Sequence, residues 1–485
     1  MNIAEPLAHH ARARANHPAI IDGERVVLYR DLDALVRRTA GHLLSLGLAR
    51  GDVVGVALRD SIEHLVILFA LARAGMVMLP LDWRWTAGEQ ARIAEHFGAR
   101  RVLTEPGAAP LQAMPRTVID EAWSAAVANA SPDHDFPQGD GPLLMSLSSG
   151  TTGRPKGPRL KHSQFLRRFW GHWINLGFNS QDRFVSATPL YYGGGRTFCM
   201  LMLYSGATVV LFAPPYEPQD LVEEIARREA TAIFLVPTLL RRLLALPDAV
   251  LAPMRAMRLV LSSGAALHPD ERREMRARIC PGFVEYYSST EGGGVSYLTS
   301  QDPERYDQSV GRPVFAVEVQ CVDEQHQPLA PGQIGRIRYR GPAVADGFWN
   351  DPDASREAFR DGWYYPGDLG RMDEDGYLFL KGRAKDMIIR GGINIYPAEI
   401  EAVLQSHPAV RECTVVGWPS REFNEEVAAF VILGGEAAAA ELRGHCRAQL
   451  APYKVPKEVF IVKDFPRNAL GKVIKSELSA TLPAL

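Results

Sequence analysis

The first hundred residues alternate between short runs of β-branched or apolar residues and longer stretches with apolar residues at helical spacing. The short runs predict strands, and the longer stretches predict helices. We expect strands at 25–29, 52–58, 77–81 and 101–103, and helices at 31–48, 62–74 and 87–97. This alternation is typical of an α/β fold, in which helices cover the faces of a mostly parallel sheet.

The same alternation resumes after the glycine-rich segment 148–157. It predicts strands at 184–187, 207–211 and 232–236 and helices at 221–229 and 239–246. Two later strands run into turns of small residues, at 259–266 and 283–294. Ligands of open α/β sheets bind outside the carboxyl ends of strands, so these turns predict the border of a binding site. The Ala-, Pro- and Asp-rich residues 122–142 predict a surface connection.

From about residue 310 the expected strands become shorter and are separated by Gly, Pro and Asp turns, which indicates a β-rich subdomain. The polar segment Gly382–Asp386 marks a second change of character. We therefore expect a large N-terminal domain of α/β layers with the β-rich subdomain (1–384) and a small, mobile α+β C-terminal domain (385–485). In the small domain we expect helices at 397–407 and 438–450 and strands at 412–416, 427–433 and 458–462.

The composition excludes several classes of protein. A chain of 485 residues is too long for one hydrophobic core, which agrees with two or more domains. Its formal net charge of −2 gives no basic field for nucleic acid or an anionic membrane. The five cysteines form no C-x-x-C pair, which argues against a disulfide framework or a structural zinc site and for a reducing compartment. No membrane span is expected, and the first residues lack the pattern of a signal peptide, so we expect a cytoplasmic protein.

The segment SSGTTGRPKG at 148–157 has the composition of a phosphate-binding loop. Glycines let backbone N–H groups approach an anion closely, hydroxyl groups add donors, and Lys156 adds a positive charge. The Walker A pattern does not fit these residues. Taken alone, the segment could equally be a flexible surface loop.

Four further segments follow in order: SSGAA (262–266), YSSTE (287–291), YPGDLG (365–370) with GRAKDMIIRGGINIYPAEIE (382–401), and NALGK (468–472). Together with the loop at 148–157 they resemble the adenylate-forming superfamily of acyl-CoA synthetases, non-ribosomal adenylation domains and luciferases. The resemblance covers nearly the whole chain, and its pattern is most similar to that of acid–CoA ligases. One motif would be weak support, whereas five in order are strong support.

The resemblance implies that a carboxylate attacks the α-phosphorus of ATP, that an acyl-AMP forms, and that a thiol then takes the acyl group. It implies Glu291 and Thr151 as magnesium ligands and catalytic residues, and Asp368 and Arg383 as contacts of the ribose or a phosphate. An exposed acid at a helix start is the plain alternative for Glu291. The implied ATP-binding residues are Ser148, Ser149, Gly150, Thr151, Thr152, Gly153, Lys156, Gly264, Ala265, Ala266, Tyr287, Ser288, Ser289, Thr290, Asp368, Arg383 and Lys472.

Lys472 corresponds to the family's catalytic lysine. Its ammonium could neutralise the attacking carboxylate and the α-phosphate oxygens together. A lysine is most often a surface residue, but the match of the NALGK segment outweighs that prior. The resemblance also implies Lys385 as the hinge about which the small domain turns. It implies Gly391, Gly392 and Phe423 as CoA contacts, although Phe423 could equally be a packing residue.

The chain departs from the family pattern where the acyl pocket is expected. An aromatic–His pair is usual there, but this chain has Tyr191 and Tyr192 followed by glycines. The expected pocket residues are Tyr191, Tyr192, Gly193, Gly194, Gly195, Pro237 and Gly292. Arg196 could pair with a second carboxylate of a malonate-like substrate, although an arginine there is more often structural. Smaller departures are Ser288 for glycine, Pro366 for threonine and Lys475 for arginine.

Amino-acid-activating relatives place an aspartate in this segment to pair with the substrate's ammonium group. Tyr192 and Gly193 stand at that point here, and a buried ammonium without a partner is costly, so an α-amino acid is disfavoured. The first hypothesis is therefore an ATP- and magnesium-dependent ligase that joins an aliphatic or aromatic acid to CoA. The second is a stand-alone adenylation enzyme that loads the phosphopantetheine of an acyl carrier protein. The third is a non-catalytic nucleotide-binding module.

Overall fold

The computed structural model describes residues 2–111, 114–147, 156–264, 267–390, 393–420, 423–467 and 472–483. The chain forms two compact units. Unit 1 comprises Met1–Val319 and Tyr339–Tyr364, and unit 2 comprises Gln320–Arg338 and Tyr365–Leu485. The strands β16 (Glu318–Val322) and β17 (Gly335–Arg340) contain the points where the chain passes from one unit to the other.

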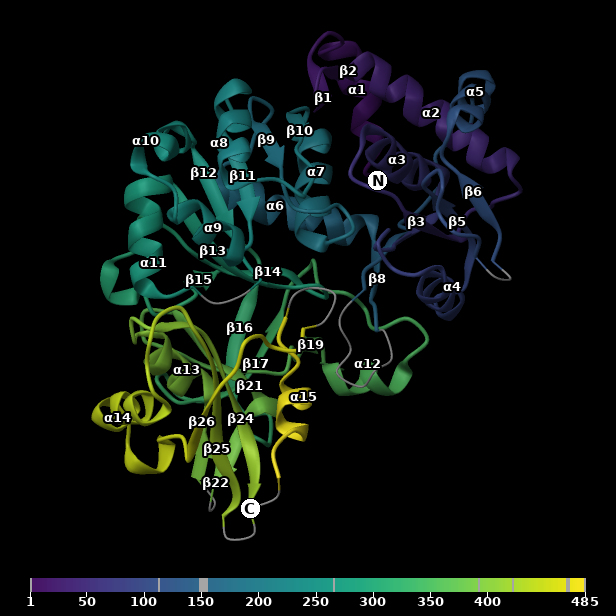
Figure 1. Cartoon of the computed structure of the whole chain (residues 1–485). Helices are drawn as coiled ribbons and strands as arrows, with labels where there is room; N and C mark the ends of the chain where they lie inside the picture. Colours follow the sequence, from purple (N-terminus) through teal and green to yellow (C-terminus); the bar gives the residue numbers. More distant parts are fainter. Residues whose placement is uncertain are drawn as a thin grey trace. The chain divides into compact units, whose positions relative to one another are not determined.

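The larger sheet of unit 1 has nine strands, and its central strands are parallel. Their order is β15 (Arg312–Pro313), β14 (Gly293–Leu298), β13 (Phe283–Ser289), β12 (Leu259–Ser262), β11 (Ala232–Leu235), β9 (Arg183–Ser186), β10 (Thr208–Leu211), β1 (Pro18–Asp22) and β2 (Arg25–Leu28). Apolar residues of α8 (Pro218–Arg227) and α9 (Pro237–Leu244) pack on one face of this sheet (Figure 1). The short helices α10 (Asp248–Leu251) and α11 (Pro269–Glu274) follow them in the chain.

The second sheet of unit 1 has six strands and is parallel except at β8. Its order is β6 (Arg116–Val118), β5 (Ala99–Thr104), β3 (Val53–Ala57), β4 (Val77–Pro80), β7 (Pro142–Met145) and β8 (Arg159–Lys161). The connecting helices are α1 (Glu5–Ala13), α2 (Tyr29–Ser45), α3 (Ile62–Ala74), α4 (Ala87–His96) and α5 (Glu121–Asn129). The α/β alternation expected from the sequence is confirmed in both sheets.

The predicted surface connection at 122–142 is wrong in its first part, because α5 occupies it. The Asp120 side chain caps the helix by accepting a hydrogen bond from the Trp123 N–H at 2.9 Å. Trp123 and Val127 are buried in the main core of unit 1. The short apolar spacing of this Ala-rich helix gave too weak a pattern to predict it.

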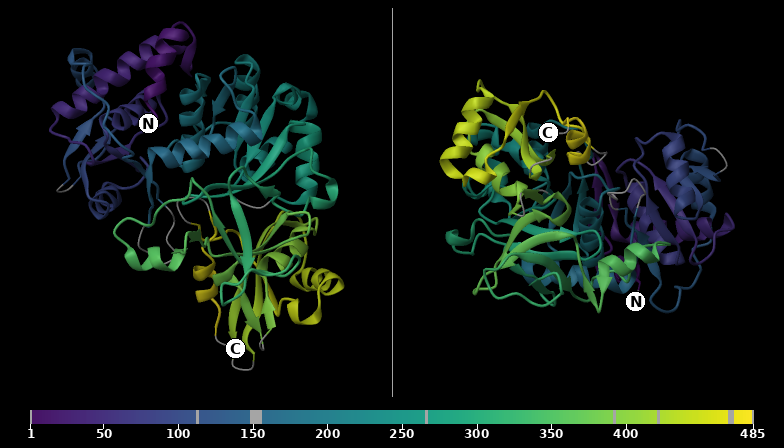
Figure 2. Two further views of the ribbon diagram at one scale, coloured as in Figure 1. Left: turned by 180° about the vertical axis from the view of Figure 1, so that it is seen from behind. Right: turned by 90° about the horizontal axis from the view of Figure 1, so that it is seen from below.

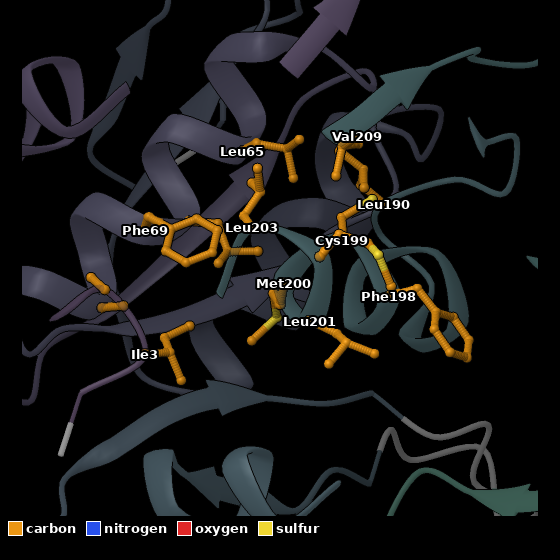
Figure 3. Close-up of a cluster of buried hydrophobic side chains, with 14 of the residues drawn as sticks. Ile3, Leu65, Phe69, Leu190, Phe198, Cys199, Met200, Leu201, Leu203 and Val209 are labelled. Carbon is orange, nitrogen blue, oxygen red and sulfur yellow. The ribbon is translucent and has the colours of Figure 1, made fainter. Parts of the chain in front are cut away.

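The helix α7 (Gly193–Ser205) lies in the main core of unit 1 and is apolar almost all round. In Figure 3, Leu203 points toward Phe69 and Leu65 of α3, whereas Phe198 points away from them. The Phe198 ring stacks instead on Phe234 of β11, with centroids 5.3 Å apart. The helix therefore joins the nine-stranded sheet to the helical layer of the other sheet. Also in this unit are α6 (His162–Leu176), α12 (Pro352–Ala358), β18 (Phe359–Arg360) and β19 (Trp363–Tyr364).

Unit 2 contains two antiparallel strands, β20 (Asp368–Met372) and β21 (Leu378–Arg383), and a five-stranded sheet. The order of that sheet is β23 (Ile393–Ile395), β22 (Ile388–Arg390), β25 (Asn424–Leu433) and β24 (Val410–Ser420), and β26 (Glu458–Ile461) also pairs with β25. Residues of β25 alternate between its two faces. Odd-numbered ones pack on α13 (Pro397–Gln405) and α14 (Ala439–Gln449), and even-numbered ones on α15 (Lys475–Ala480). Figure 2 shows α14 and α15, in yellow, beside this sheet.

These elements match the α+β pattern expected for the C-terminal part of the chain. The two compact units do not coincide with the predicted domains 1–384 and 385–485, and that boundary, like the mobility of the small domain, stays a prediction. In the described part of the chain no helix combines the length and the apolar character that a membrane crossing requires.

Candidate active site

The turn between β13 and β14 carries Glu291. The strands form a hairpin in which Ser289 pairs with Gly293, so the expected small-residue turn is shorter than predicted. Glu291 is 6% exposed, and its backbone carbonyl accepts a hydrogen bond from the Ala345 N–H at 2.9 Å. The Gly292 N–H donates to the Ser289 Oγ at 2.9 Å, and a Cβ at Gly292 would overlap the Tyr339 ring. The turn is thus held rigidly by neighbouring backbone and side chains.

The second small-residue turn lies beside the first one. Strands β12 and β13 are parallel neighbours, with Ser262 opposite Glu285, so their carboxyl ends meet at one edge of the sheet. The Ser263 and Ser288 hydroxyl groups hydrogen-bond across this edge at 3.0 Å. Gly264 has φ = 103° and open space where a Cβ would stand, which fits close approach by a ligand. Ala265 and Ala266 lie outside the described residues.

Most of the expected phosphate loop, residues 148–155, lies outside the described residues. The apolar run before it is the strand β7, as predicted. Lys156 is described, and its Nζ lies 5.9 Å from the centroid of the Phe348 ring. Two residues later, Pro158 forms a backbone bridge with Phe348.

The three glycines at the start of α7 differ in their surroundings. A Cβ at Gly193 would meet nothing within 4 Å, whereas one at Gly194 would lie 2.5 Å from the Phe234 ring. A Cβ at Gly195 would overlap the backbone carbonyl of Thr188. Only Gly193 therefore leaves open space, and the other two allow α7 to pack closely on its neighbours. Pro237 is the buried first residue of α9.

The residues before this helix are held by arginines. Tyr191 and Tyr192 have ring centroids 4.3 Å apart, and the Arg84 guanidinium bonds both the Tyr191 hydroxyl and the Asp82 carboxylate. Arg196 is 1% exposed and donates to the carbonyls of Leu190 and Tyr191 at 2.9 and 3.0 Å. Burial, and then the charge of Arg168, lower the pKa of Arg196 to about 9.

Unit 2 brings three of the expected site residues together. Asp368 begins β20 and Arg383 ends β21, and their register places them opposite each other. The Arg383 Nε lies 2.8 Å from the Asp368 carboxylate, and its other end donates to the Pro366 carbonyl at 2.7 Å. Burial lowers the pKa of Lys472, the Arg383 charge lowers it further, and the Asp368 charge opposes both. The lysine therefore lies within electrostatic reach of the Asp368–Arg383 pair.

The expected hinge and CoA residues lie in the same unit. Lys385 is the exposed middle residue of a short 3₁₀ turn, Ala384–Asp386, whose first N–H donates to the Gly367 carbonyl at 2.9 Å. The Arg390 guanidinium lies 4.3 Å from the centroid of the Phe423 ring and pairs with the Glu426 carboxylate at 2.6 Å. Gly391 and Gly392 lie outside the described residues.

Sequence reasoning missed one buried residue next to the Glu291 turn. Arg168 of α6 is 8% exposed and donates from one terminal nitrogen to the carbonyls of Thr290 and Glu291, at 3.1 and 3.0 Å. It lies among apolar residues of the same helix at helical spacing, such as Phe165 and Phe169. A charged residue on an otherwise apolar helix face was the available signal.

Magnesium would depend on the substrate for part of its coordination shell. Among the described residues, no group of three or more His, Cys, Asp or Glu side chains could hold a metal ion. Magnesium commonly binds one or two carboxylates together with substrate phosphates, so a single carboxylate such as Glu291 fits this mode.

Comparison with known proteins identifies the family. Residues 7–349 match the family model described as AMP-binding enzyme, and residues 399–472 match the AMP-binding enzyme C-terminal domain. The chain is 33% identical over 506 aligned positions to the indoleacetate–CoA ligase of Aromatoleum aromaticum, covering 99% of this chain and 98% of that protein. It is 30% identical to the fatty acid–[acyl-carrier-protein] ligase ScoC of Streptomyces coeruleorubidus, covering 98% of this chain and 95% of that protein.

Two solved structures match over nearly the whole chain. ATP-bound MatB from Rhodopseudomonas palustris has a TM-score of 0.90 and 31% identity, with 99% of each chain covered. The o-succinylbenzoate–CoA synthetase from Bacillus subtilis in complex with ATP and magnesium has a TM-score of 0.89 and 28% identity, with 97% of this chain and 98% of that chain covered. The protein therefore belongs to the AMP-binding enzyme family. Within it the chain is an AMP-forming acid–thiol ligase of the acyl-CoA synthetase type, which confirms the resemblance seen in the sequence.

Proposed function

We propose that this enzyme joins a carboxylic acid other than an α-amino acid to CoA, at the expense of ATP and with magnesium. In the first step an acid oxygen attacks the α-phosphorus of ATP, and pyrophosphate leaves. In the second step the thiol sulfur attacks the acyl carbon, the thiol loses its proton, and AMP leaves. The observation that carries the proposal is the grouping of Asp368, Arg383 and Lys472 in unit 2.

Each member of this group suits one part of the adenylation step. The Asp368 carboxylate can accept hydrogen bonds from both ribose hydroxyl groups, and Arg383 fixes its orientation through their 2.8 Å contact. Lys472 can place a positive charge between the acid and the α-phosphate, where negative charge accumulates in the transition state. Positioning and charge stabilisation supply most of the rate enhancement in phosphoryl-type transfer.

The turns at the ends of β12 and β13 in unit 1 have features of their own that suit a nucleotide. Gly264 offers open space for a flat ring, and Glu291 offers a carboxylate for magnesium. The loop at 148–157 would bind the β- and γ-phosphates through Thr151, Thr152 and Lys156. The rigid hydrogen bonding of the Glu291 turn supports a fixed rather than an adaptable metal position.

Free CoA is the preferred acceptor. The Arg390 guanidinium and the Phe423 ring form a stacked pair on unit 2, and such a surface suits a purine ring. The alternative acceptor is the phosphopantetheine of a carrier protein, and the similarity to the ScoC ligase is the observation that favours it. Assays with CoA and with a holo-carrier protein separate the two, because an enzyme that ignores CoA but acylates the carrier would contradict our preference.

The decisive experiment measures ATP–pyrophosphate exchange with a panel of acids, followed by thioester formation with CoA. We expect Lys472→Ala to lower the exchange rate roughly 10²–10³-fold, as loss of one transition-state charge contact does, while ATP still binds. Lys463→Ala is the matched control, because Lys463 is an exposed lysine outside the site. Exchange near the wild-type rate in Lys472→Ala would show that the lysine is wrongly assigned.

A further inference from the structure

A small cavity lies in unit 1 immediately behind the Glu291 turn. Its volume is about 20 Å³, and it lies between α6, β14 and the segments 314–317 and 342–343. Its polar lining consists of Arg167, Arg168 and His172 from α6 and Tyr297 from β14, and Gly294 leaves one side without a side chain. Arg167 is exposed, whereas the Arg168 side chain is buried. This volume exceeds that of one water-sized probe, so the cavity holds a polar end group but not a ring.

Arg168 places an unbalanced positive charge in this cavity. One terminal nitrogen donates to three backbone carbonyls, but the Nε is buried and, within the described residues, has no hydrogen-bond partner. No ion pair joins Arg168 to a described carboxylate. The described groups that favour its charged form electrostatically are Tyr339, then Glu291, the proposed magnesium ligand, and Tyr286. A buried cation without a counter-charge is costly, so a bound anion would be stabilised here.

The other polar groups nearby do not supply that counter-charge. Burial, followed by the Arg168 charge, lowers the pKa of His172 to about 3, so this histidine is neutral at pH 7. Its Nδ1 lies 2.6 Å from the Tyr297 hydroxyl. Arg196 adds a second buried guanidinium within electrostatic reach of Arg168.

The contacts link this cavity to the expected acyl pocket. Gly194 lies against the Phe234 ring, Phe234 stacks on Phe198, and the Phe198 ring centroid lies 4.9 Å from that of His172. On the other side, the expected pocket residue Gly292 is two positions from Gly294. Packed aromatic rings therefore connect the expected acyl pocket with the cavity, and at Gly294 a Cβ would meet no atom closer than 3.4 Å.

Helix geometry separates the two arginines. Gly194 and Phe198 are four residues apart on α7 and share one face, which is directed at Phe234. Arg196 lies between them in sequence and so projects from the opposite face, where its charge influences His64 of α3. Arg168, and not Arg196, is thus the guanidinium on the pocket side.

We propose that Arg168, with the Tyr297–His172 pair, binds the far end of the acid substrate, and that this end carries a second carboxylate. The inference rests on the proposed function and adds the substrate class: a dicarboxylic acid, activated at one end and recognised at the other. The apolar and aromatic residues between the two ends suit a hydrocarbon linker.

The test compares dicarboxylic acids with monocarboxylic acids of the same carbon count in ATP–pyrophosphate exchange, over a range of chain lengths. We expect kcat/KM for the best diacid to exceed that of its monoacid at least about tenfold, because the monoacid leaves the buried guanidinium uncompensated. Arg168→Met should remove this preference and Arg168→Lys should retain part of it. Arg255→Met, which replaces an exposed arginine outside the cavity, should retain all of it.

The ratio of the two kcat/KM values isolates recognition from the support that Arg168 gives to the Glu291 turn, since that support affects both acids alike. If Arg168→Met does not fold, Tyr297→Phe keeps the ring and removes only the hydroxyl, and it should lower the ratio several-fold. A wild-type preference for monoacids at every length would overturn the inference, as would an unchanged ratio in folded Arg168→Met. Absence of exchange with every acid would instead contradict the proposed function.

Discussion

Asp60 is a largely buried carboxyl group whose ionisation opposes folding. Its Oδ1 accepts a hydrogen bond from the Leu190 N–H at 2.9 Å, but its Oδ2 is buried and unpartnered within the described part of the chain. Burial raises the pKa of Asp60 from 3.8 to about 7, with the Leu190 hydrogen bond acting in the opposite direction. Between these two values the folded state binds more protons than the unfolded state, so the stability from this group falls as pH rises and is lost above pH 7.

Replacing Asp60 by Asn retains an oxygen acceptor for Leu190 and removes the charge. We expect Asp60→Asn to be more stable than the wild type by roughly 1–3 kcal/mol above about pH 7, and the difference to vanish near pH 4. Urea unfolding of both proteins at several pH values measures it. A difference that stayed constant with pH would show that Asp60 is ionised in the folded protein throughout.

At the residue scale the motifs predicted site residues, three of which the structure places near one another. Lys472, Asp368 and Arg383 were predicted as site residues, and they lie within electrostatic reach in unit 2. Arg168 was missed because a charged residue on an apolar helix face indicates burial but does not show that its side chain reaches the Glu291 turn. The different surroundings of Gly193 and Gly195 could not be predicted from the sequence either, since they depend on contacts beyond the local pattern.

At the element scale, alanine substitutions in the helix α7 test whether its glycines are needed for close packing or leave open space. At Gly195 a Cβ would overlap the Thr188 backbone carbonyl, which cannot move aside as a side chain can. We expect Gly195→Ala to lose about 1–3 kcal/mol of stability or more and to weaken acid activation. At Gly193 there is open space, so Gly193→Ala should be neutral or slightly stabilising, because alanine favours a helix.

Chemical unfolding of these two variants gives the stability difference, and exchange assays give the effect on acid binding. Equal losses of stability in both variants would mean that α7 begins elsewhere or packs differently.

Elements with clear end signals were predicted best: α3 spans Ile62–Ala74, as expected, between the Ser61 cap and Gly75 with φ = 74°. The start of α7 was not predicted, because three consecutive glycines disfavour a helix unless burial compensates.

For the whole molecule, the order of the motifs predicted the family and the α/β architecture, because both depend on local runs of sequence. The composition of the compact units was beyond such reasoning. Residues 320–338 belong to unit 2 and residues 339–364 to unit 1, so the chain returns to unit 1 before it ends in unit 2. The assignment of these segments to one unit or the other depends on long-range strand pairing, for example of Gly335 with Gly370. No local signal in the sequence encodes such pairing.

The last prediction concerns motion between the two chemical steps. Lys385 is the proposed hinge, in an exposed turn with few constraints on its side chain. If the chain must change its backbone angles there, Lys385→Pro should retain adenylation within a few-fold, because the first step needs no rotation. Thioester formation should fall roughly 10²-fold or more, since proline fixes φ of residue 385 and restricts Ala384 before it. Lys385→Ala, which removes the charge but not the backbone freedom, should support both steps. Pyrophosphate exchange measures the first step, and single-turnover transfer from preformed acyl-AMP to CoA measures the second. Equal slowing of both steps in Lys385→Pro would point to a structural defect, and unimpaired transfer would place the hinge elsewhere in the chain.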